Sequence, residues 1–153
     1  MIVVTGGAGF IGSAIVWKLN QQGKTNIVIV DELGKDEKWK NLVGLKYEDF
    51  VNKLEFIEQI LDDVIPYNIE AIIHMGANSS TTEKDADHLM DNNYHYTKEL
   101  AKFCVEKNIR FIYASSAATY GDGALGFDDD ESKLETLRPL NMYGYSKQLF
   151  DLW

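Results

Sequence analysis

A glycine-rich loop directly after a short apolar run leaves this chain few possible folds. The segment Thr5-Gly6-Gly7-Ala8-Gly9-Phe10-Ile11-Gly12 fits both G-x-x-G-x-x-G and G-x-G-x-x-G. In such loops one glycine permits a tight turn off a strand, another lets the backbone approach a pyrophosphate, and a third allows close packing of a helix on the sheet. The loop predicts a dinucleotide site in which phosphate lies against N–H groups at a helix start.

The residues around the loop match this prediction. Ile11–Gln22 is predicted to be a helix, because apolar residues recur there every four positions and Gly23 can close it. Asp31 ends the next apolar run, 19 residues after Gly12, where an acid can bind ribose hydroxyls. A glycine-rich turn that binds no ligand would need neither this helix nor an acid at the end of the next apolar run. No Gly-Lys-Ser/Thr follows, which excludes a P-loop.

Short apolar runs alternate with helical stretches along the chain. The runs are rich in Ile and Val and lack polar alternation, which is typical of a parallel sheet covered on both faces. They are Ile2–Thr5, Ile27–Asp31, Ala71–His74 and Phe111–Ser115. A further helix is predicted over Asp85–Asn108. Because parallel strands need right-handed crossovers, we predict an α/β fold with a doubly wound parallel sheet.

Two stretches are expected to be solvated loops. Glu32–Asp49 mixes lysines with acids and allows one helical turn at most. Gly121–Glu135 contains four adjacent acids, Asp128–Glu131. Adjacent residues cannot all face one ion, and the three histidines complete no ligand set at an established spacing. No metal site is predicted.

Composition and charge exclude other functions. Of 153 residues, 15 are Lys or Arg and 24 are Asp or Glu, so the net charge of −9 argues against binding of duplex nucleic acid. No apolar run approaches the roughly 18 residues of a membrane span, and the first residues lack a signal-peptide pattern, so a cytoplasmic protein is expected. The lone cysteine, Cys104, is expected to be a small buried residue.

A second group of polar residues follows the fourth apolar run. Ser115 and Ser116 end that run, and Tyr143 and Lys147 have the Y-x-x-x-K spacing that puts both side chains on one face of a helix. A phenol with a pKa of about 10 is a poor base at neutral pH unless a nearby ammonium lowers its pKa. Together with a serine hydroxyl and a nicotinamide dinucleotide, this pair predicts oxidation of an alcohol.

Two other phenols compete with Tyr143. Tyr145 lies two residues before Lys147 and faces another side of the helix, while Tyr120 follows the strand and is expected to line the site without titrating. Tyr143 is therefore the predicted acid/base. A Y-x-x-x-K spacing also occurs by chance on surface helices, but the glycine loop and the strand-end serine favour the catalytic interpretation.

Together the motifs resemble extended short-chain dehydrogenases/reductases that act on nucleotide sugars. The matching segments are Thr5–Gly12, Ser115–Gly121 and Tyr143–Lys147. Three further segments are similar to the group of ADP-L-glycero-D-manno-heptose 6-epimerases: Ile72–Asp85, Met90–Tyr94 and Pro139–Asp151. The resemblance extends over residues 1–153 and implies a Rossmann-like NAD(P)-binding domain.

The resemblance also implies roles for single residues. Ser116 would orient substrate, Tyr143 would be the acid/base and Lys147 its partner. The implied cofactor site comprises the loop glycines, the residues over the pyrophosphate, the acids and lysines at the adenosine end and the cleft lining: Gly6, Gly9, Phe10, Ile11, Gly12, Asp31, Glu32, Lys38, Lys53, Met75, Gly76, Ala77, Asn78, Ser79 and Asn92.

The activity implied is epimerisation of ADP-glycero-manno-heptose at C6 through a transient carbonyl, in lipopolysaccharide inner-core synthesis. The implied cofactor is NADP, one per subunit and retained through the reaction, and the implied parent enzyme is a homo-oligomer. Asp31 and Glu32 favour the free ribose hydroxyls of NAD, which is the alternative. Lysines 35, 38 and 40 would neutralise a phosphate if their loop folded back.

Members of the family continue past the Tyr/Lys helix into a substrate lobe that supplies a second acid/base. The chain is therefore expected to be truncated, to retain a dinucleotide cleft and to be inactive alone. Two alternatives stay open. One is another nucleotide-sugar epimerase or a dehydratase, although a dehydratase typically has an Asp-Glu pair where Ala117 and Ala118 stand. The other is a non-catalytic dinucleotide-binding module.

Overall fold

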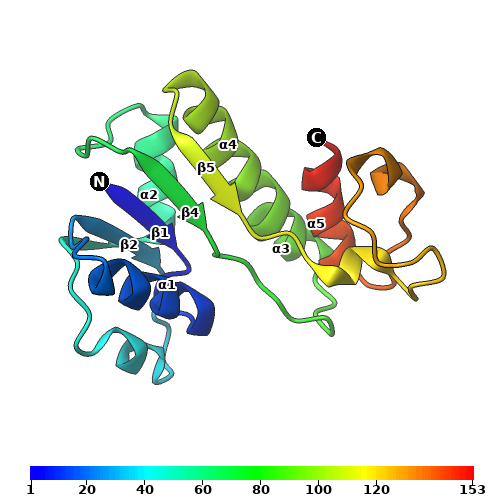
Figure 1. Cartoon of the computed structure of the whole chain (residues 1–153), viewed down its shortest axis with the longest axis horizontal. Helices are drawn as coiled ribbons and strands as arrows, with labels where there is room; N and C mark the ends of the chain where they lie inside the picture. The colour runs from blue at the N-terminus through cyan, green and yellow to red at the C-terminus, as the bar shows by residue number, and fades with distance from the viewer. The chain divides into compact units, whose positions relative to one another are not determined.

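The computed structural model describes residues 1–153, which form two compact units. The first unit comprises Met1–Gly76 and Glu99–Tyr113 and contains the β-sheet. The second unit comprises Ala77–Lys98 and Ala114–Trp153 and is built from helices and loops. Figure 1 shows the elements of each unit.

The first unit has a five-stranded parallel sheet, which confirms the predicted fold class. Its strands are β1 (Ile2–Thr5), β2 (Ile27–Asp31), β3 (Asp49–Asn52), β4 (Ala71–His74) and β5 (Arg110–Tyr113). They lie in the order β3-β2-β1-β4-β5, and all neighbours are parallel. The chain starts in the middle strand and adds strands outward in both directions, as a doubly wound sheet does.

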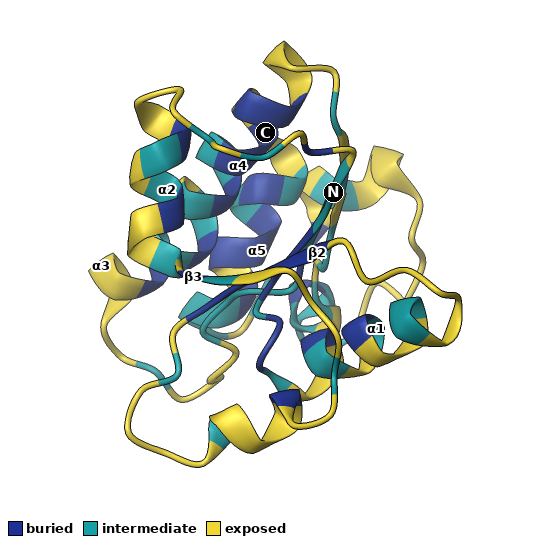
Figure 2. Cartoon of the chain, turned by 90° about the vertical axis from the view of Figure 1, so that its left-hand side faces the viewer, coloured by how far each residue is buried: buried dark blue, intermediate teal, exposed yellow.

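Helices cover both faces of this sheet. Helix α1 (Phe10–Gln21) lies on one face, and α2 (Lys53–Leu61) and α4 (Tyr96–Glu106) lie on the other, α4 contributing its residues from Glu99 onward to this unit (Figures 1 and 2). The α1 face is filled by a cluster that includes Val4, Val16 and Ile29, which are completely buried, and partly buried apolar neighbours. Every residue of β2 is buried, which explains its uninterrupted apolar sequence.

The two edge strands differ from the prediction in different ways, because β3 was not predicted and β5 was predicted with other bounds. Strand β3 lies where the loop Glu32–Asp49 was expected to end, and its first and last residues are polar and exposed because it has only β2 as a neighbour. Strand β5 ends at Tyr113, so Ser115 lies beyond the strand. The one helical turn expected in the loop is the 3₁₀ turn η1 (Lys38–Leu42).

The second unit contains the Tyr/Lys helix. Its elements are α3 (Ala86–Leu89), the π-helical turn η2 (Met90–His95), the start of α4, the 3₁₀ turns η3 (Ala117–Tyr120) and η4 (Glu131–Thr136), and α5 (Met142–Leu152). The helix predicted over Asp85–Asn108 therefore exists but contains a π turn. The predicted loop Gly121–Glu135 likewise contains a helical turn, because η4 begins at Glu131. Asn141 caps α5 by accepting a hydrogen bond from Gly144 N at 2.8 Å.

Two properties of the chain bear on its chemistry. Cys104 is buried in the first unit, and burial raises the pKa of its thiol to about 12, so the thiol is protonated at neutral pH. This agrees with the predicted role of a small buried residue.

No helix has both the length and the apolar composition needed to cross a membrane.

Candidate functional site

The glycine loop is packed too tightly for side chains. Gly6 has φ +64°, and a Cβ atom there would lie 2.7 Å from Gly76 N. A Cβ atom on Gly12 would lie 2.1 Å from the carbonyl oxygen of Gly6, so this glycine lets α1 approach the loop. Hydrogen bonds from Gly6 N to Val30 O (2.8 Å) and from Gly9 N to Gly6 O (2.9 Å) hold the turn. The loop thus has two of the glycine functions that the sequence predicts.

The start of α1 is suited to an anion. Its N-cap, Gly9, offers no side-chain acceptor, and the first turn contains no acidic residue. N–H groups in a first helical turn have no intrahelical acceptor and lie at the positive end of the helix dipole. Phe10 and Ile11 are 88% and 63% exposed beside them, where a bound pyrophosphate could be covered. The residues present therefore fit a dinucleotide.

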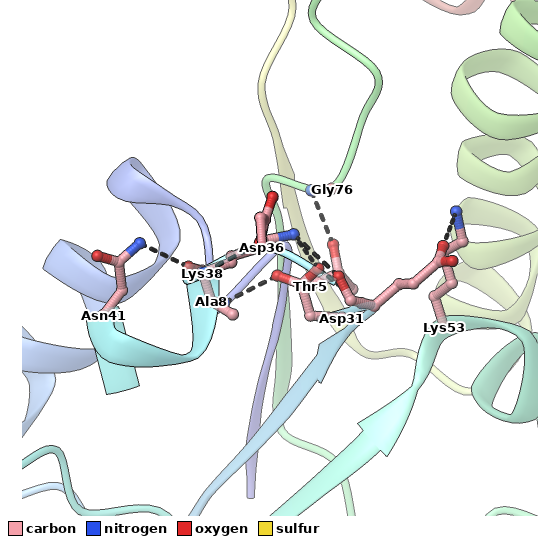
Figure 3. A network of polar contacts seen from close by, with 9 residues as sticks. Thr5, Ala8, Asp31, Asp36, Lys38, Asn41, Lys53 and Gly76 are labelled. Carbon is pink, nitrogen blue, oxygen red and sulfur yellow. Dashed lines mark hydrogen bonds and ion pairs between the residues drawn. The ribbon is translucent and has the colours of Figure 1, made fainter. Parts of the chain in front are cut away.

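A buried pair links the ends of β1 and β4 in the same unit. Thr5 Oγ1 lies 2.6 Å from His74 Nδ1. The same hydroxyl oxygen accepts a hydrogen bond from Gly76 N at 3.1 Å, which Figure 3 shows. Both side chains are almost completely buried. The contact fixes the backbone of Gly76 against Gly6, at the sheet edge where ligands bind in doubly wound folds.

Asp31, predicted to bind the adenosine ribose, also binds the glycine loop. Its Oδ2 accepts a hydrogen bond from Ala8 N at 2.8 Å, and its Oδ1 accepts from Glu32 N at 2.7 Å and from Lys38 Nζ at 2.5 Å (Figure 3). On the other side of the loop, Asn41 Nδ2 donates to Ala8 O at 2.9 Å. The Asp31 carboxylate therefore positions the loop in addition to any contact with a ligand.

The predicted acids and lysines of the adenosine end come together in two ion pairs. Lys38 pairs with Asp31, and Lys53 Nζ lies 2.7 Å from Glu32 Oε2. The Lys53 side chain is 30% exposed and that of Glu32 is 54% exposed, so solvent reaches this second pair. Two ammonium groups thus lie at the carboxyl end of β2 beside two carboxylates, which makes this end of the site close to neutral.

Lys147 is buried in the second unit. It is 4% exposed, and its Nζ donates a hydrogen bond to Ala114 O at 2.9 Å. Burial lowers the pKa of Lys147, and the nearby Asp151 carboxylate opposes this effect. Asp151 in turn accepts a hydrogen bond from Ser115 Oγ at 2.5 Å.

The predicted Ser116 and Tyr143 belong to the same unit. Ser116 Oγ caps η3 by accepting a hydrogen bond from Ala118 N at 3.1 Å, which leaves its O–H proton for another acceptor. Tyr143 is partly buried on α5, whereas the competing Tyr145 is 47% exposed. Tyr120 Oη donates to the Asp129 carboxylate, and this hydrogen bond raises the pKa of Tyr120.

Asn93 is a buried polar residue that the sequence analysis missed. Its Oδ1 accepts from Asn78 N (2.9 Å) and Asn92 Nδ2 (3.1 Å), and its Nδ2 donates to Asn78 O (3.0 Å) and Ser146 Oγ (3.1 Å). The Asn93 amide thereby connects the loop at Asn78 to Ser146 of α5, which directly precedes Lys147. Helical periodicity gave no sign of this, because Asn93 faces inward from a π turn.

The structure places the predicted residues in two groups, one in each unit. The first unit holds the loop glycines with Phe10 and Ile11, the acids and lysines of the adenosine end, and Met75 and Gly76. The second unit holds the remaining predicted residues: Ala77, Asn78, Ser79, Asn92, Ser116, Tyr143 and Lys147. Besides Asn93, the residues missed are Thr5, His74 and Asp151, whose importance depends on partners distant in sequence. Ser115 was predicted beside Ser116, but its contact with Asp151 was not.

The sequence comparisons agree with one another on one protein family. The model of the NAD dependent epimerase/dehydratase family matches residues 2–153. The ADP-L-glycero-D-manno-heptose-6-epimerase of Nitratidesulfovibrio vulgaris is 59% identical over 153 residues, and that of Fusobacterium nucleatum is 59% identical over 155. Each alignment covers 100% of this chain and 47% of the relative, so the chain spans about half the length of these curated relatives.

Solved structures of epimerases have the same fold. The ADP-L-glycero-D-manno-heptose-6-epimerase of Helicobacter pylori superposes with a TM-score of 0.81 at 27% identity, covering 99% of this chain and 49% of that one. The UDP-glucose 4-epimerase of Brucella ovis, in complex with NAD, has a TM-score of 0.74 at 26% identity, covering 99% and 45%.

Proposed function

Because the chain belongs to the NAD-dependent epimerase/dehydratase family, we propose that it is the cofactor-binding part of an enzyme that epimerises ADP-glycero-manno-heptose at C6. The observation that carries this proposal is the 59% identity to two heptose epimerases along the whole chain. From the resemblance we extend the proposal to a cytoplasmic, homo-oligomeric enzyme of lipopolysaccharide inner-core synthesis.

The first unit would hold the dinucleotide. The first-turn N–H groups of α1 would bind the pyrophosphate, Phe10 and Ile11 would cover it, and Asp31 and Glu32 would meet the ribose. The resemblance implies further cofactor-binding residues at Met75–Ser79 and Asn92, of which Met75 and Gly76 belong to this unit. A bound nicotinamide supplies reversible two-electron oxidation of an alcohol.

The second unit would handle the proton. Tyr143 Oη would exchange the proton of the substrate alcohol in one half-reaction, and the Lys147 ammonium would stabilise the phenolate form. Ser116 Oγ, which already accepts from Ala118 N, would donate its proton to the substrate oxygen and orient it. Because inversion at C6 returns the hydride to the opposite face of the transient carbonyl, the other half-reaction would use the second acid/base that the resemblance assigns to the substrate lobe.

NADP is the proposed cofactor, with NAD as the alternative. Lys38 and Lys53 support NADP, because a 2′-phosphate needs cations at the carboxyl end of β2. Their pairing with Asp31 and Glu32 supports NAD, since carboxylates there favour free ribose hydroxyls. NADP requires that Lys53 exchange Glu32 for the phosphate, which the exposure of this pair permits.

A chimera tests the proposed function. Residues 1–153 of this chain replace the matching segment of the N. vulgaris relative, and the product of ADP-D-glycero-D-manno-heptose is analysed by NMR. We expect conversion to the C6 epimer, and we expect the Tyr143→Phe chimera to lose at least about 100-fold in rate. Tyr145→Phe is the matched control and should retain activity.

The same chimera distinguishes the open alternatives. Titration with NADPH and NADH should give tighter binding of NADPH, and tighter binding of NADH would replace NADP by NAD in the proposal. Conversion of a UDP-hexose but not of ADP-heptose would assign another nucleotide-sugar epimerase. Dinucleotide binding with no turnover, when the unmodified relative is active, would favour the non-catalytic module.

A further inference from the structure

The buried ammonium of Lys147 has an acidic neighbour whose function the catalytic set does not explain. Asp151 follows Lys147 by four residues on α5, so the two side chains lie on the same helix face. Tyr143 precedes Lys147 by four residues on that face. Lys147 thus lies between the proposed acid/base and a carboxylate.

The segment opposite this helix face is held at two consecutive residues. Ala114 O accepts a hydrogen bond from Lys147 Nζ at 2.9 Å, and Ser115 Oγ donates to Asp151 Oδ2 at 2.5 Å. Lys147 and Asp151 are one helical turn apart on α5, so the two contacts fix both the distance and the direction of the Ala114–Ser115 backbone. Loss of the Ser115 contact would leave the Ala114 carbonyl with its hydrogen bond to Lys147 but without this second tie to α5.

The electrostatics of the site point to the same residue. Burial lowers the pKa of Lys147, and Asp151 is the charged group that acts to raise it. Helix α5 packs against α3, η2, η3 and η4. The titratable side chains on those elements are Asp87 and His88 of α3, Asp91, Tyr94 and His95 of η2, Tyr120 of η3, and Glu131, Lys133 and Glu135 of η4.

We propose that Asp151 is a positioning residue for Lys147, acting together with Ser115: the pair holds the Ala114 carbonyl at the lysine ammonium and places a carboxylate one helical turn from it. The consequence for catalysis rests on the proposed role of Lys147, because a neutral lysine could not stabilise a phenolate at Tyr143. The positioning itself is a property of this chain and is measurable without cofactor or substrate.

The test is an NMR titration of the 153-residue chain labelled at lysine Cε, with the Lys147 signal assigned by Lys147→Arg. Asp151→Asn removes the charge and keeps an acceptor for Ser115. We expect the Lys147 midpoint to move to lower pH by several tenths of a unit at least, while the other lysines stay unchanged. Asp151→Glu restores the charge and should recover most of the shift. Asp87→Asn, an exposed acid on α3, is the matched control and should leave the midpoint unchanged.

Ser115→Ala keeps the Asp151 charge and removes the hydroxyl that orients it, so it should give a smaller shift in the same direction. If Asp151→Asn does not fold, Ser115→Ala tests whether the Ser115–Asp151 pair positions Lys147. An unchanged Lys147 midpoint in a folded Asp151→Asn or Ser115→Ala variant overturns the proposal, as does an equal shift in Asp87→Asn. Since no substrate is present, a chimera that fails to epimerise would disprove the proposed function and leave this result intact.

Discussion

Single residues of the glycine loop differ in what they contribute. Gly12 has no room for a Cβ atom, which would lie 2.1 Å from Gly6 O. A Cβ atom on Gly9 would lie 3.1 Å from the same oxygen, and Gly9 has an ordinary φ of −72°. Gly12 is therefore a packing residue, whereas Gly9 keeps the backbone open at the start of α1.

This difference predicts that two similar substitutions have different main effects, one on stability and the other on dinucleotide binding. Gly12→Ala should reduce the free energy of unfolding by about 1–3 kcal/mol or more, because α1 or the loop must shift to admit the methyl group. Gly9→Ala should change stability much less but weaken dinucleotide binding, since its methyl group lies where the pyrophosphate would approach. Urea unfolding and dinucleotide titration of both variants measure the two effects. An equally small loss of stability in both variants would show that the close contact at Gly12 is relieved at little cost.

At the scale of elements, the central strands and the edge strand β5 could be predicted from their apolar runs, whereas the edge strand β3 could not. Strands β1 and β2 are flanked on both sides by other strands, so burial requires their continuous Ile and Val residues. Strand β3 is an edge strand with sequence Asp-Phe-Val-Asn, and its existence depends on hydrogen bonds to β2 more than on its composition. Strand β5 is shorter than its apolar run because Ser116 starts a 3₁₀ turn.

The hydrogen bonds of Thr5 at the ends of β1 and β4 support a second prediction. Thr5→Val keeps the shape of the side chain but removes the hydroxyl that contacts His74 Nδ1 and Gly76 N. We expect a loss of about 1–3 kcal/mol in unfolding free energy, because buried polar groups lose a hydrogen-bond partner. Thr5→Ser keeps the hydroxyl and should be clearly more stable than Thr5→Val in the same urea titration. If both variants lose the same amount, the methyl group and not the hydroxyl is responsible.

At the scale of the whole molecule, stability should fall in alkali partly through Cys104. The pKa of this thiol is raised from 9.0 to about 12 in the folded chain, so folding favours the protonated form. The contribution is complete below about pH 9 and is lost as pH rises toward 12, because the unfolded thiol ionises first. Between pH 9 and pH 10 the loss is about 1 kcal/mol.

Cys104→Ala isolates this contribution. The variant is less stable at neutral pH because it leaves a small cavity, but its unfolding free energy should fall by about 1 kcal/mol less between pH 9 and pH 10 than that of the unmodified chain. Urea unfolding at both pH values measures this difference. Parallel declines in the two proteins would show that other groups cause the alkaline loss.

The sequence by itself determined the fold class and most candidate residues, because glycine spacing, apolar runs and the Y-x-x-x-K interval are local patterns with direct steric meaning. Tertiary structure alone decided which residues support them. Asp31 binds Ala8 across 23 positions, Thr5 meets His74 across 69, and Ser115 meets Asp151 across 36. Such contacts depend on how strands and helices come together after folding, and a buried polar side chain is satisfied by whatever partner packing brings to it.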